Sequence, residues 1–484
     1  MQKIAVILSF LLLVLTSCHK DPKVVNPQDF PKEIGTLIVG KCATSGCHNN
    51  ASYLAANGLN LSTWENMFKG TASGNSSVIP YRSDFSSFCY FTNTYPDLGV
   101  SIEPTMPVND APLTRDEYIM IRNWIDAGAP NADGKIKFAD NASRKKFYVT
   151  NMACDVVTVF DSETLLPMRY VTVGNKSTTE FPQCIKVSPD KKYWYVSFFT
   201  QSGMIQKFDA ETDKLVGQIN IGLGSWNSFE ITSDSKFAWV ADNTSSNGKL
   251  AYVDLDNMAL LNTSTLNFQY MSGMVINENL KKMYIGSSFG NFLYKIDITN
   301  PLYPIISEMT IDGSSTSVYT SVLDPVTLTL DPTTNKCYVA CQKTNEIRVI
   351  NMQTDAVMAT IPLSSYPNSI SYSNASKKLF VACPDDTVSF IGSRGSINVV
   401  DCNSNVLLTK INSGWQPYGL AVDDQRNLVT VANANLTSNG PAPHHVSGCG
   451  GRNGYVSFID LGTLTVIPNK KPEVAVFPYG VAAR

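Results

Sequence analysis

Phe147-Tyr148-Val149-Thr150-Asn151 is a short run of aromatic and β-branched residues, and the rest of the chain repeats it. Such residues favour β-strands because their side chains pack well on a pleated surface. The copies follow one another at intervals of roughly 40 to 55 residues, a period typical of propellers and solenoids. The seven copies are Phe147–Asn151, Trp194–Ser197, Ala238–Asp242, Met283–Gly286, Cys337–Cys341, Leu379–Cys383 and Val429–Asn433.

An acidic or amide residue follows each copy, just before a polar turn. Asp and Asn side chains bond to backbone groups two residues on, which closes a hairpin. We therefore interpret these residues as structural and not as a ring of catalytic acids. They are Asp161, Asp209, Asp254, Asp297, Asn351, Asp401 and Asp460.

A further repeated motif precedes most copies of the β-run. It is clearest at Phe181–Val187, Trp226–Ile231, Tyr366–Tyr372 and Trp415–Val422. The last copy of this motif, Phe477–Ala483, has no β-run after it. The first β-run, in turn, has no such motif before it. A ring resolves both gaps, because the last strand then completes the first blade and buries the open edges. The sequence predicts an all-β seven-bladed propeller over residues 147–484, closed by the C-terminal strand.

The Tyr148-Val149-Thr150-Asn151 motif and its repeats resemble the YVTN-type seven-bladed propellers of bacterial surface and periplasmic proteins. The resemblance implies a fold and leaves the function open, because propellers carry catalysis, cofactor binding and protein docking alike. A net charge of −3 with 16% charged residues gives no basic surface for nucleic acid. We expect no nucleic-acid partner.

The start of the chain is typical of an export signal. Lys3 precedes the apolar run from Ile4 to Leu15, which is too short to cross a bilayer, and small residues then lead into Cys18. This start resembles a bacterial lipoprotein signal, which implies removal of residues 1–17, lipidation of Cys18 and a tether over residues 18–29. The expected location is the cell envelope, at the outer membrane, through the N-terminal lipid. The alternative is an ordinary secretory signal with a chance cysteine.

Cys42-Ala43-Thr44-Ser45-Gly46-Cys47-His48 follows a segment whose apolar residues have helical spacing. Two thiols with an adjacent histidine suit one covalent haem c: Cys42 and Cys47 would form the thioethers and His48 would bind the iron. Four residues separate the cysteines instead of the usual two, and Gly46 helps the extra residues to loop out. The alternatives are a Cys42–Cys47 disulfide, or zinc, for which a fourth ligand is missing.

Met106 stands between Pro104 and Pro107, and a helix with a Thr114–Glu117 capping box follows. Together with the cysteine motif, these features resemble the small class I cytochrome c domains found on large secreted bacterial proteins. The resemblance implies an all-α haem domain over residues 30–130, followed by a linker over 131–146. It also implies that His48 and Met106 are the axial iron ligands, which leave no open coordination position.

A loop rich in Gly and Pro, residues 439–451, interrupts the seventh repeat. His444, His445 and Cys449 in this loop are weak candidates for a metal site or for contact with the haem domain. An ordinary surface loop is the alternative. Export permits disulfides, but the pairing of the remaining cysteines cannot be deduced from the sequence.

Three functions remain open. The first is electron transfer at a membrane surface, with the propeller docking a redox partner protein. The second is a haem-linked periplasmic oxidoreductase with its substrate site in the propeller, so enzymatic activity is undecided. The third is a surface protein that binds partner proteins or glycans.

Overall fold

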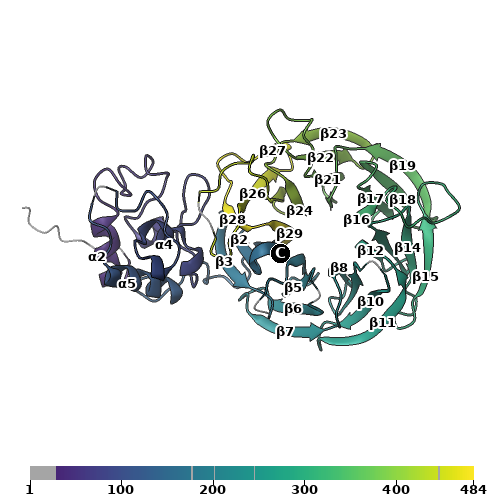
Figure 1. Cartoon of the computed structure of the whole chain (residues 1–484), viewed down its shortest axis with the longest axis horizontal. Helices are drawn as coiled ribbons and strands as arrows, with labels where there is room; N and C mark the ends of the chain where they lie inside the picture. Colours follow the sequence, from purple (N-terminus) through teal and green to yellow (C-terminus); the bar gives the residue numbers. More distant parts are fainter. Residues whose placement is uncertain (1–28, 109, 176–177, 201, 245, 445–446) are drawn as a thin grey trace, which may run out of the picture.

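A computed structural model describes residues 29–108, 110–175, 178–200, 202–244, 246–444 and 447–484. Seven antiparallel sheets are arranged in a ring, and a smaller N-terminal region lies beside the ring (Figure 1). The centre of the ring holds a channel lined by strands of every blade. The predicted seven-bladed β-propeller is therefore confirmed.

Each blade is one sheet whose strands run from the channel outward. Blades 1 to 3 are β29 (Pro478–Ala483), β1 (Lys146–Asn151), β2 (Val156–Asp161), β3 (Leu166–Thr172); β4 (Pro182–Val187), β5 (Tyr193–Phe198), β6 (Met204–Asp209), β7 (Leu215–Asn220); and β8 (Trp226–Ile231), β9 (Phe237–Asp242), β10 (Gly248–Asp254), β11 (Ala259–Phe268). Blades 4 and 5 are β12 (Met271–Asn277), β13 (Lys282–Ser287), β14 (Phe292–Asp297), β15 (Ile305–Thr310); and β16 (Pro325–Asp331), β17 (Lys336–Cys341), β18 (Glu346–Asn351), β19 (Ala356–Pro362). Blades 6 and 7 are β20 (Ser369–Ser373), β21 (Lys378–Cys383), β22 (Ser396–Asp401), β23 (Val406–Ile411); and β24 (Pro417–Asp423), β25 (Leu428–Asn433), β26 (Asn453–Asp460), β27 (Thr465–Val466), with β28 (Glu473–Val476) also paired to β26.

The repeated β-run forms the second strand of every blade. It is mostly apolar and buried because each sheet packs face to face on its neighbours, which covers both of its faces. One core cluster, for example, joins Tyr338 and Val349 of blade 5 to Leu379 and Val381 of blade 6. The predicted turn role of the acidic residues is also confirmed, since each accepts a backbone N–H of its own turn.

The last strand of the chain lies in the first blade. β29 pairs antiparallel with β1, and Ala482 lies opposite Tyr148. The N–H of Gly480 also donates to Thr150 Oγ1 over 2.8 Å. The N-terminal and C-terminal ends of the repeat region therefore share one sheet.

A buried ion pair joins blade 1 to blade 2. Lys146 Nζ lies 2.7 Å from Asp213 Oδ2, and Trp194 Nε1 donates to the other carboxylate oxygen. Burial raises the pKa of Asp213 and lowers that of Lys146, so each charge depends on its partner. The arrangement recurs between blades 4 and 5, where Lys282 Nζ lies 2.6 Å from Asp355 Oδ1.

Asp213→Ala should lower the free energy of unfolding by about 3 to 5 kcal/mol, because it leaves the Lys146 ammonium buried without its counter-charge. Asp256→Ala, at an exposed position, is the matched control. Its free energy of unfolding should stay within about 0.5 kcal/mol of the wild-type value. Guanidinium unfolding followed by tryptophan fluorescence measures both. Equal midpoints for the two variants would show that the pair contributes nothing.

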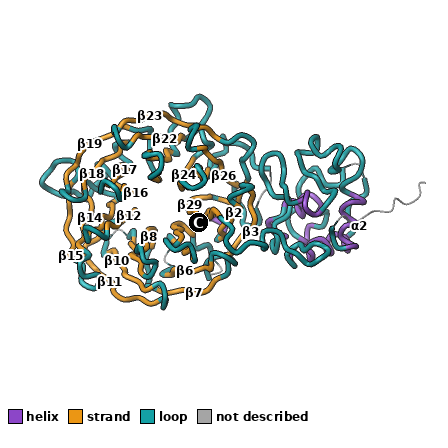
Figure 2. The backbone as a smooth tube through the Cα atoms, turned by 180° about the vertical axis from the view of Figure 1, so that it is seen from behind, coloured by secondary structure: helices purple, strands orange, loops and turns teal. Residues whose placement is uncertain are grey.

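The N-terminal region contains α2 (Lys32–Lys41), α3 (Trp64–Met67), α4 (Ser87–Thr92) and α5 (Arg115–Asp126), with 3-10 turns η1 (Ser83–Phe85) and η2 (Pro96–Leu98). The predicted capping box is present, because Thr114 and Glu117 bond to each other's backbone N–H. An all-α domain is not evident, since loops rich in Gly, Asn, Ser and Pro separate these helices (Figure 2).

The N-terminal region packs against blades 1 and 7. Phe85 stacks on Tyr170 of β3 with ring centroids 4.3 Å apart, and Arg82 Nη1 donates to the Tyr170 carbonyl over 2.9 Å. The backbone N–H of Glu473, in β28, donates to Asn75 Oδ1 over 2.6 Å. The region thus covers the outer edge of the ring where its first and last blades meet.

Candidate haem-binding site

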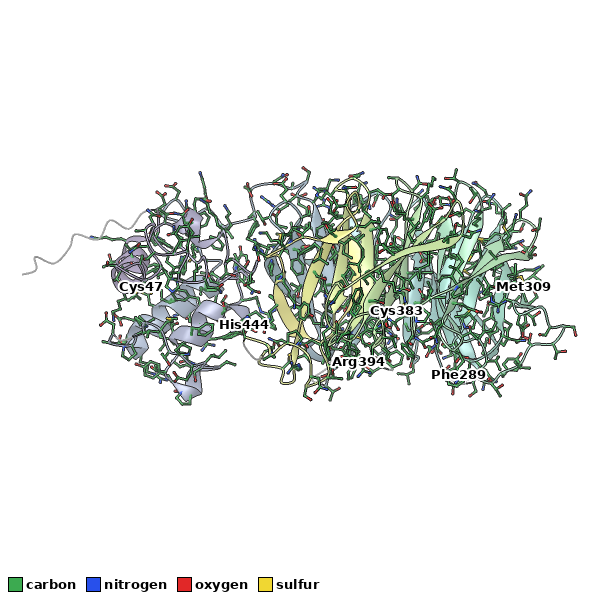
Figure 3. The ribbon with its side chains drawn as sticks, turned by 90° about the horizontal axis from the view of Figure 1, so that it is seen from above. Cys47, Phe289, Met309, Cys383, Arg394 and His444 are labelled. Atoms are coloured by element: carbon green, nitrogen blue, oxygen red, sulfur yellow. A yellow bond between two sulfur atoms is a disulfide. The ribbon has the colours of Figure 1, made fainter. Side chains whose placement is uncertain are left out.

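The motif residues predicted to bind a cofactor line one cavity of about 460 Å³ in the N-terminal region. Cys42, Cys47, His48 and Met106 all border it. The remaining wall is mostly apolar, with Ala55, Ala56, Leu59, Leu61, Phe88, Phe91, Pro107 and Val108, and it also includes Lys41, Gly46, Asn57, Ser77, Ser87 and Thr92. The volume lies in the range of sites that hold one cofactor-sized ligand. Figure 3 shows Cys47 in this region, well apart from the ring.

The segment between the two cysteines folds as a compact loop. Cys42 follows α2 directly, and the N–H of His48 donates back to the Cys42 carbonyl over 3.1 Å. Gly46 has φ +82°, a left-handed conformation that glycine adopts without strain. The four intervening residues therefore loop out, and the two cysteines and the histidine remain together at the cavity.

The His48 ring is held by its Nδ1 atom, which lies 3.0 Å from the Leu59 carbonyl oxygen. A carbonyl only accepts, so Nδ1 carries the proton and Nε2 keeps a free lone pair. Burial lowers the pKa of His48, which favours the neutral ring. A metal ligand requires this form of histidine. The role of the Leu59 carbonyl as the partner of His48 could not be predicted from the sequence, because the position of a backbone acceptor follows from the fold alone.

The loop that carries Met106 is anchored on α4. The Met106 N–H donates to the Phe91 carbonyl over 2.7 Å, and that of Ile102 donates to the Tyr90 carbonyl over 3.0 Å. These bonds bring a residue 58 positions beyond His48 to the same cavity. The sequence pointed to Met106 through its flanking prolines, but it gave no sign of Phe88 and Phe91.

Cys42 and Cys47 are both free thiols, so the structure does not form the alternative Cys42–Cys47 disulfide. Burial raises the pKa of Cys42 to about 12. Lys41, the one charged residue in the lining, pairs with Glu117 at 2.7 Å. The cavity therefore offers two cysteine sulfurs, an imidazole nitrogen and a thioether in a mostly apolar setting.

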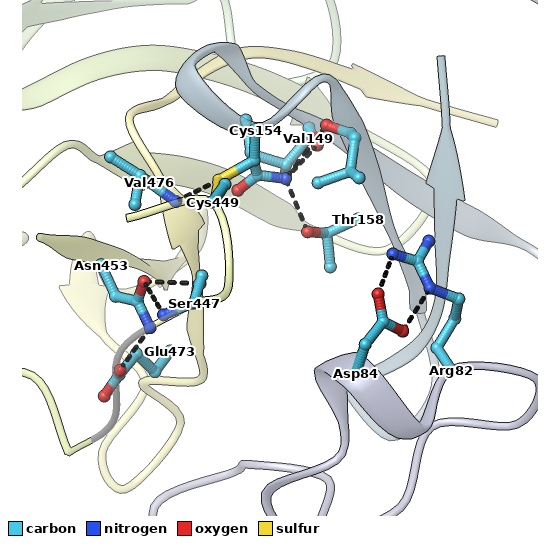
Figure 4. Close-up of a disulfide and its surroundings, with 12 residues drawn as sticks. Arg82, Asp84, Val149, Cys154, Thr158, Ser447, Cys449, Asn453, Glu473 and Val476 are labelled. Atoms are coloured by element: carbon cyan, nitrogen blue, oxygen red, sulfur yellow. Dashed lines mark hydrogen bonds and ion pairs between the residues drawn. A yellow bond between two sulfur atoms is a disulfide. The ribbon is translucent and has the colours of Figure 1, made fainter. Parts of the chain in front are cut away.

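Of the three weak candidates in the seventh blade, His444 and Cys449 lie within the described residues. Cys449 forms a disulfide with Cys154 of η3 (Met152–Cys154), so its sulfur is not free to bind a metal and that part of the prediction is wrong (Figure 4). The alternative, contact with the haem domain, stays a prediction. The backbone N–H of His444 donates to Glu473, and His445 lies outside the described residues. Across the described ranges, no three His, Cys, Asp or Glu residues gather as a metal site.

Cys18 and the export signal lie outside the described residues. Among the helices that the structure describes, none is long and apolar enough to cross a membrane.

A second cavity, of about 360 Å³, lies in the channel of the ring. Its wall comes from the innermost strands of all seven blades, β29, β4, β8, β12, β16, β20 and β24, and it is mainly polar. It lies apart from the cysteine motif and shares no lining residue with the first cavity.

No protein-family model and no curated protein matches this sequence. Among solved structures, the chain is similar to a functionally unknown protein from Desulfotomaculum acetoxidans, with 13% identity, a TM-score of 0.53, and coverage of 70% of this chain and 98% of that one. Lower similarity is found to Kuenenia stuttgartiensis hydrazine synthase (18% identity, TM-score 0.46, covering 60% and 81%) and to U3-55K (13%, 0.45, covering 62% and 84%). The first of these likenesses supports the propeller fold and says nothing of function.

Proposed function

We propose that this chain is an exported, lipid-anchored c-type cytochrome that transfers electrons and uses its YVTN-type propeller to dock a redox partner. The observation that carries the proposal is the single apolar cavity that gathers Cys42, Cys47, His48 and Met106. In this proposal residues 30–130 are the cytochrome domain, β29 closes the ring, and lipid on Cys18 holds the protein at the outer membrane.

The residues present fit one haem c. Cys42 and Cys47 supply two sulfurs for thioethers, and His48 presents Nε2 because Nδ1 is held by Leu59. Met106 supplies a thioether sulfur from a separate loop. Held by these residues, haem c would supply a reversible one-electron centre of raised potential. The mostly apolar wall favours the less charged state of the site.

The rim of the ring supports the docking role. The N-terminal region covers β3, whereas the outermost strands of blades 2 to 6 expose apolar side chains. These side chains are Leu215, Val216, Leu260, Leu261, Ile305, Val357, Met358, Val406 and Leu408. A contiguous patch of such side chains is typical of an interaction site, and we propose these rim strands as the place where the partner docks.

A redox titration tests the proposal directly. Full-length protein from cells with cytochrome maturation machinery is titrated while its visible spectrum is recorded. We expect one reversible one-electron transition and no change of the reduced spectrum under carbon monoxide, because both axial positions are filled. A reduced protein that binds carbon monoxide as isolated would contradict a pure electron-transfer role.

Met106→Ala should open one coordination position and lower the reduction potential, because the thioether favours the reduced iron. The reduced variant should then bind carbon monoxide, which the wild type does not. Met358→Ala, at an exposed position on the rim, is the control and should leave both properties unchanged. An unchanged spectrum in Met106→Ala would remove Met106 from the ligand set.

A further inference from the structure

One end of the ring exposes apolar side chains on its loops. In each blade the second and the outermost strands run in the same direction, so the loops that follow them lie at the same end, here called the loop end. Figure 3 shows Phe289 and Arg394, from two of these loops, near the same edge of the ring. Five loops at the loop end, 221–225, 288–291, 311–324, 363–368 and 384–395, expose Leu223, Phe289, Val318, Tyr319, Val322, Tyr366, Val388 and Ile391.

The same five loops and their neighbour, 342–345, carry little exposed charge. Within these loops, all of which the structure describes, Asp312 and Lys343 are the exposed charged residues. Asp385 and Arg394 are half-buried and neutralise each other as an ion pair at 2.7 Å. This part of the surface therefore offers apolar and uncharged polar groups and almost no net charge.

The opposite end of the ring has the reverse character. Its turns join the first strand of each blade to the second and the third to the fourth. Leu302 and Tyr303 are the exposed large apolar side chains of its described turns. Exposed charges are frequent there: Glu163, Asp190, Lys191, Lys192, Glu211, Lys214, Asp234, Lys236, Asp256 and Lys281. The two ends of one ring thus differ in the chemistry of their surfaces, which indicates that they face different surroundings.

The loop 384–395 shows how apolar side chains are presented at the loop end. Asp386 Oδ1 accepts the backbone N–H of Val388 over 3.1 Å and that of Ser389 over 3.0 Å. The side chain of Val388 is 85% exposed, and that of Ile391 is fully exposed. Polar groups of this loop are therefore bonded within the protein while its apolar side chains project outward. Such a loop enters an apolar medium at a lower cost than one with unpaired polar groups.

We propose that the loop end of the ring binds the surface of a lipid bilayer and inserts these apolar side chains into its interface. Aliphatic and aromatic side chains are favourable in that interface, whereas charged ones are costly, which matches the difference between the two ends. A protein partner would require a closely packed contact. A bilayer adapts to separate side chains at loop tips, such as Leu223, Phe289 and Ile391.

The lipid surface that fits is an uncharged one. The loops bring no cluster of Lys and Arg that would attract anionic headgroups. Among the helices that the structure describes, none crosses a membrane, so the contact is confined to the surface of the bilayer. This membrane contact goes beyond the proposed electron transfer and does not depend on lipid at Cys18.

Flotation of the full-length protein with vesicles of phosphatidylcholine tests the proposal. The Cys18→Ser background is used throughout, so that no attached lipid contributes to the binding. We expect the protein to float with the vesicles, with no change when anionic lipid is added or when the salt concentration is raised. Replacing Val388 and Ile391 together by Asp should weaken the partition about tenfold or more, because it places two charges in the interface.

Replacing Leu302 and Tyr303 together by Asp is the matched control. These side chains are exposed at the opposite end of the ring, so this variant should float as the parent does. Absence of flotation with neutral vesicles, equal flotation of the two double variants, or binding that requires anionic lipid would overturn the proposal. A dimer in sedimentation velocity that the Val388 and Ile391 replacements dissociate would also overturn it, because the loops would then contact a second copy.

The experiment is independent of the haem. The protein with Cys42 and Cys47 both replaced by serine should float as the parent does, because neither residue belongs to the loop end. Failure of flotation in a protein that carries haem would overturn the membrane contact alone, and flotation of a protein that never binds haem would overturn only the electron transfer.

Discussion

Replacing Cys42 and Cys47 by serine should give a colourless protein that still folds. A serine hydroxyl does not add to a haem vinyl group, so both covalent links are lost together. The ring should persist, because six of its core clusters contain neither residue, and Cys42 is only one member of the cluster that joins the N-terminal region to blades 1 and 2. We expect complete loss of covalent haem absorbance on a denaturing gel stained for haem, with an unchanged far-ultraviolet circular dichroism spectrum.

Cys402→Ser is the matched control for this variant. Cys402 is a buried free thiol in blade 6, outside the lining of the haem cavity, and its replacement should leave the haem stain unchanged. A double variant that retains covalent haem would show that other residues hold it. Single variants add detail, since one remaining thioether should give weaker staining than two.

Removing residues 478–484 should abolish the folded monomer. The deletion strips β29 from β1, whose six residues are all buried in the complete chain. It exposes the backbone of β1 as an open apolar edge, which invites pairing with another chain. It also removes Arg484, whose guanidinium donates to the Ala210 and Arg144 carbonyls at 2.8 and 3.1 Å. We expect aggregation on size-exclusion chromatography.

Arg484→Ala tests the contribution of the Arg484 side chain separately from that of strand β29. This variant keeps β29 and loses only the side-chain hydrogen bonds, so it should remain a monomer with about 1 to 3 kcal/mol less stability. A soluble, monomeric truncation that melts close to the full-length protein would show that the ring does not need its last strand.

The ring could be predicted from the sequence because each blade repeats the same local signal. The Val429–Asn433 run and its six relatives are apolar for the same reason, burial on both faces, so one interpretation applies to every copy. The disulfide could not be predicted, since Cys154 and Cys449 are 295 residues apart and become neighbours only where blade 1 meets blade 7.

In the N-terminal region, local sequence patterns predict the helices but not the path of the chain between them. α2 and α5 were predicted because Ile34, Leu37, Ile38 and the face of Tyr118, Ile121 and Ile125 have helical spacing, and all are buried. Between them, the path of the chain depends on single bonds such as that from His48 to Leu59, which no periodicity encodes. The expected all-α domain therefore has helices at both ends and mostly loops between.

The candidate site was accessible to sequence reasoning because its chemistry is carried by rare side chains. Two cysteines beside a histidine, and a methionine between prolines, stand out in any composition. The channel cavity gave no such signal, because lining residues such as Gln183 and Asn227 are ordinary residues in separate blades and only the ring brings them together.

The pyridine haemochrome spectrum of the full-length protein, made in cells with cytochrome maturation machinery, tests the central claim most directly. Two thioether links to Cys42 and Cys47 predict the absorption bands of haem c, with one haem per chain that organic solvent does not extract. A colourless protein in which Cys42 and Cys47 are joined to each other would contradict the account.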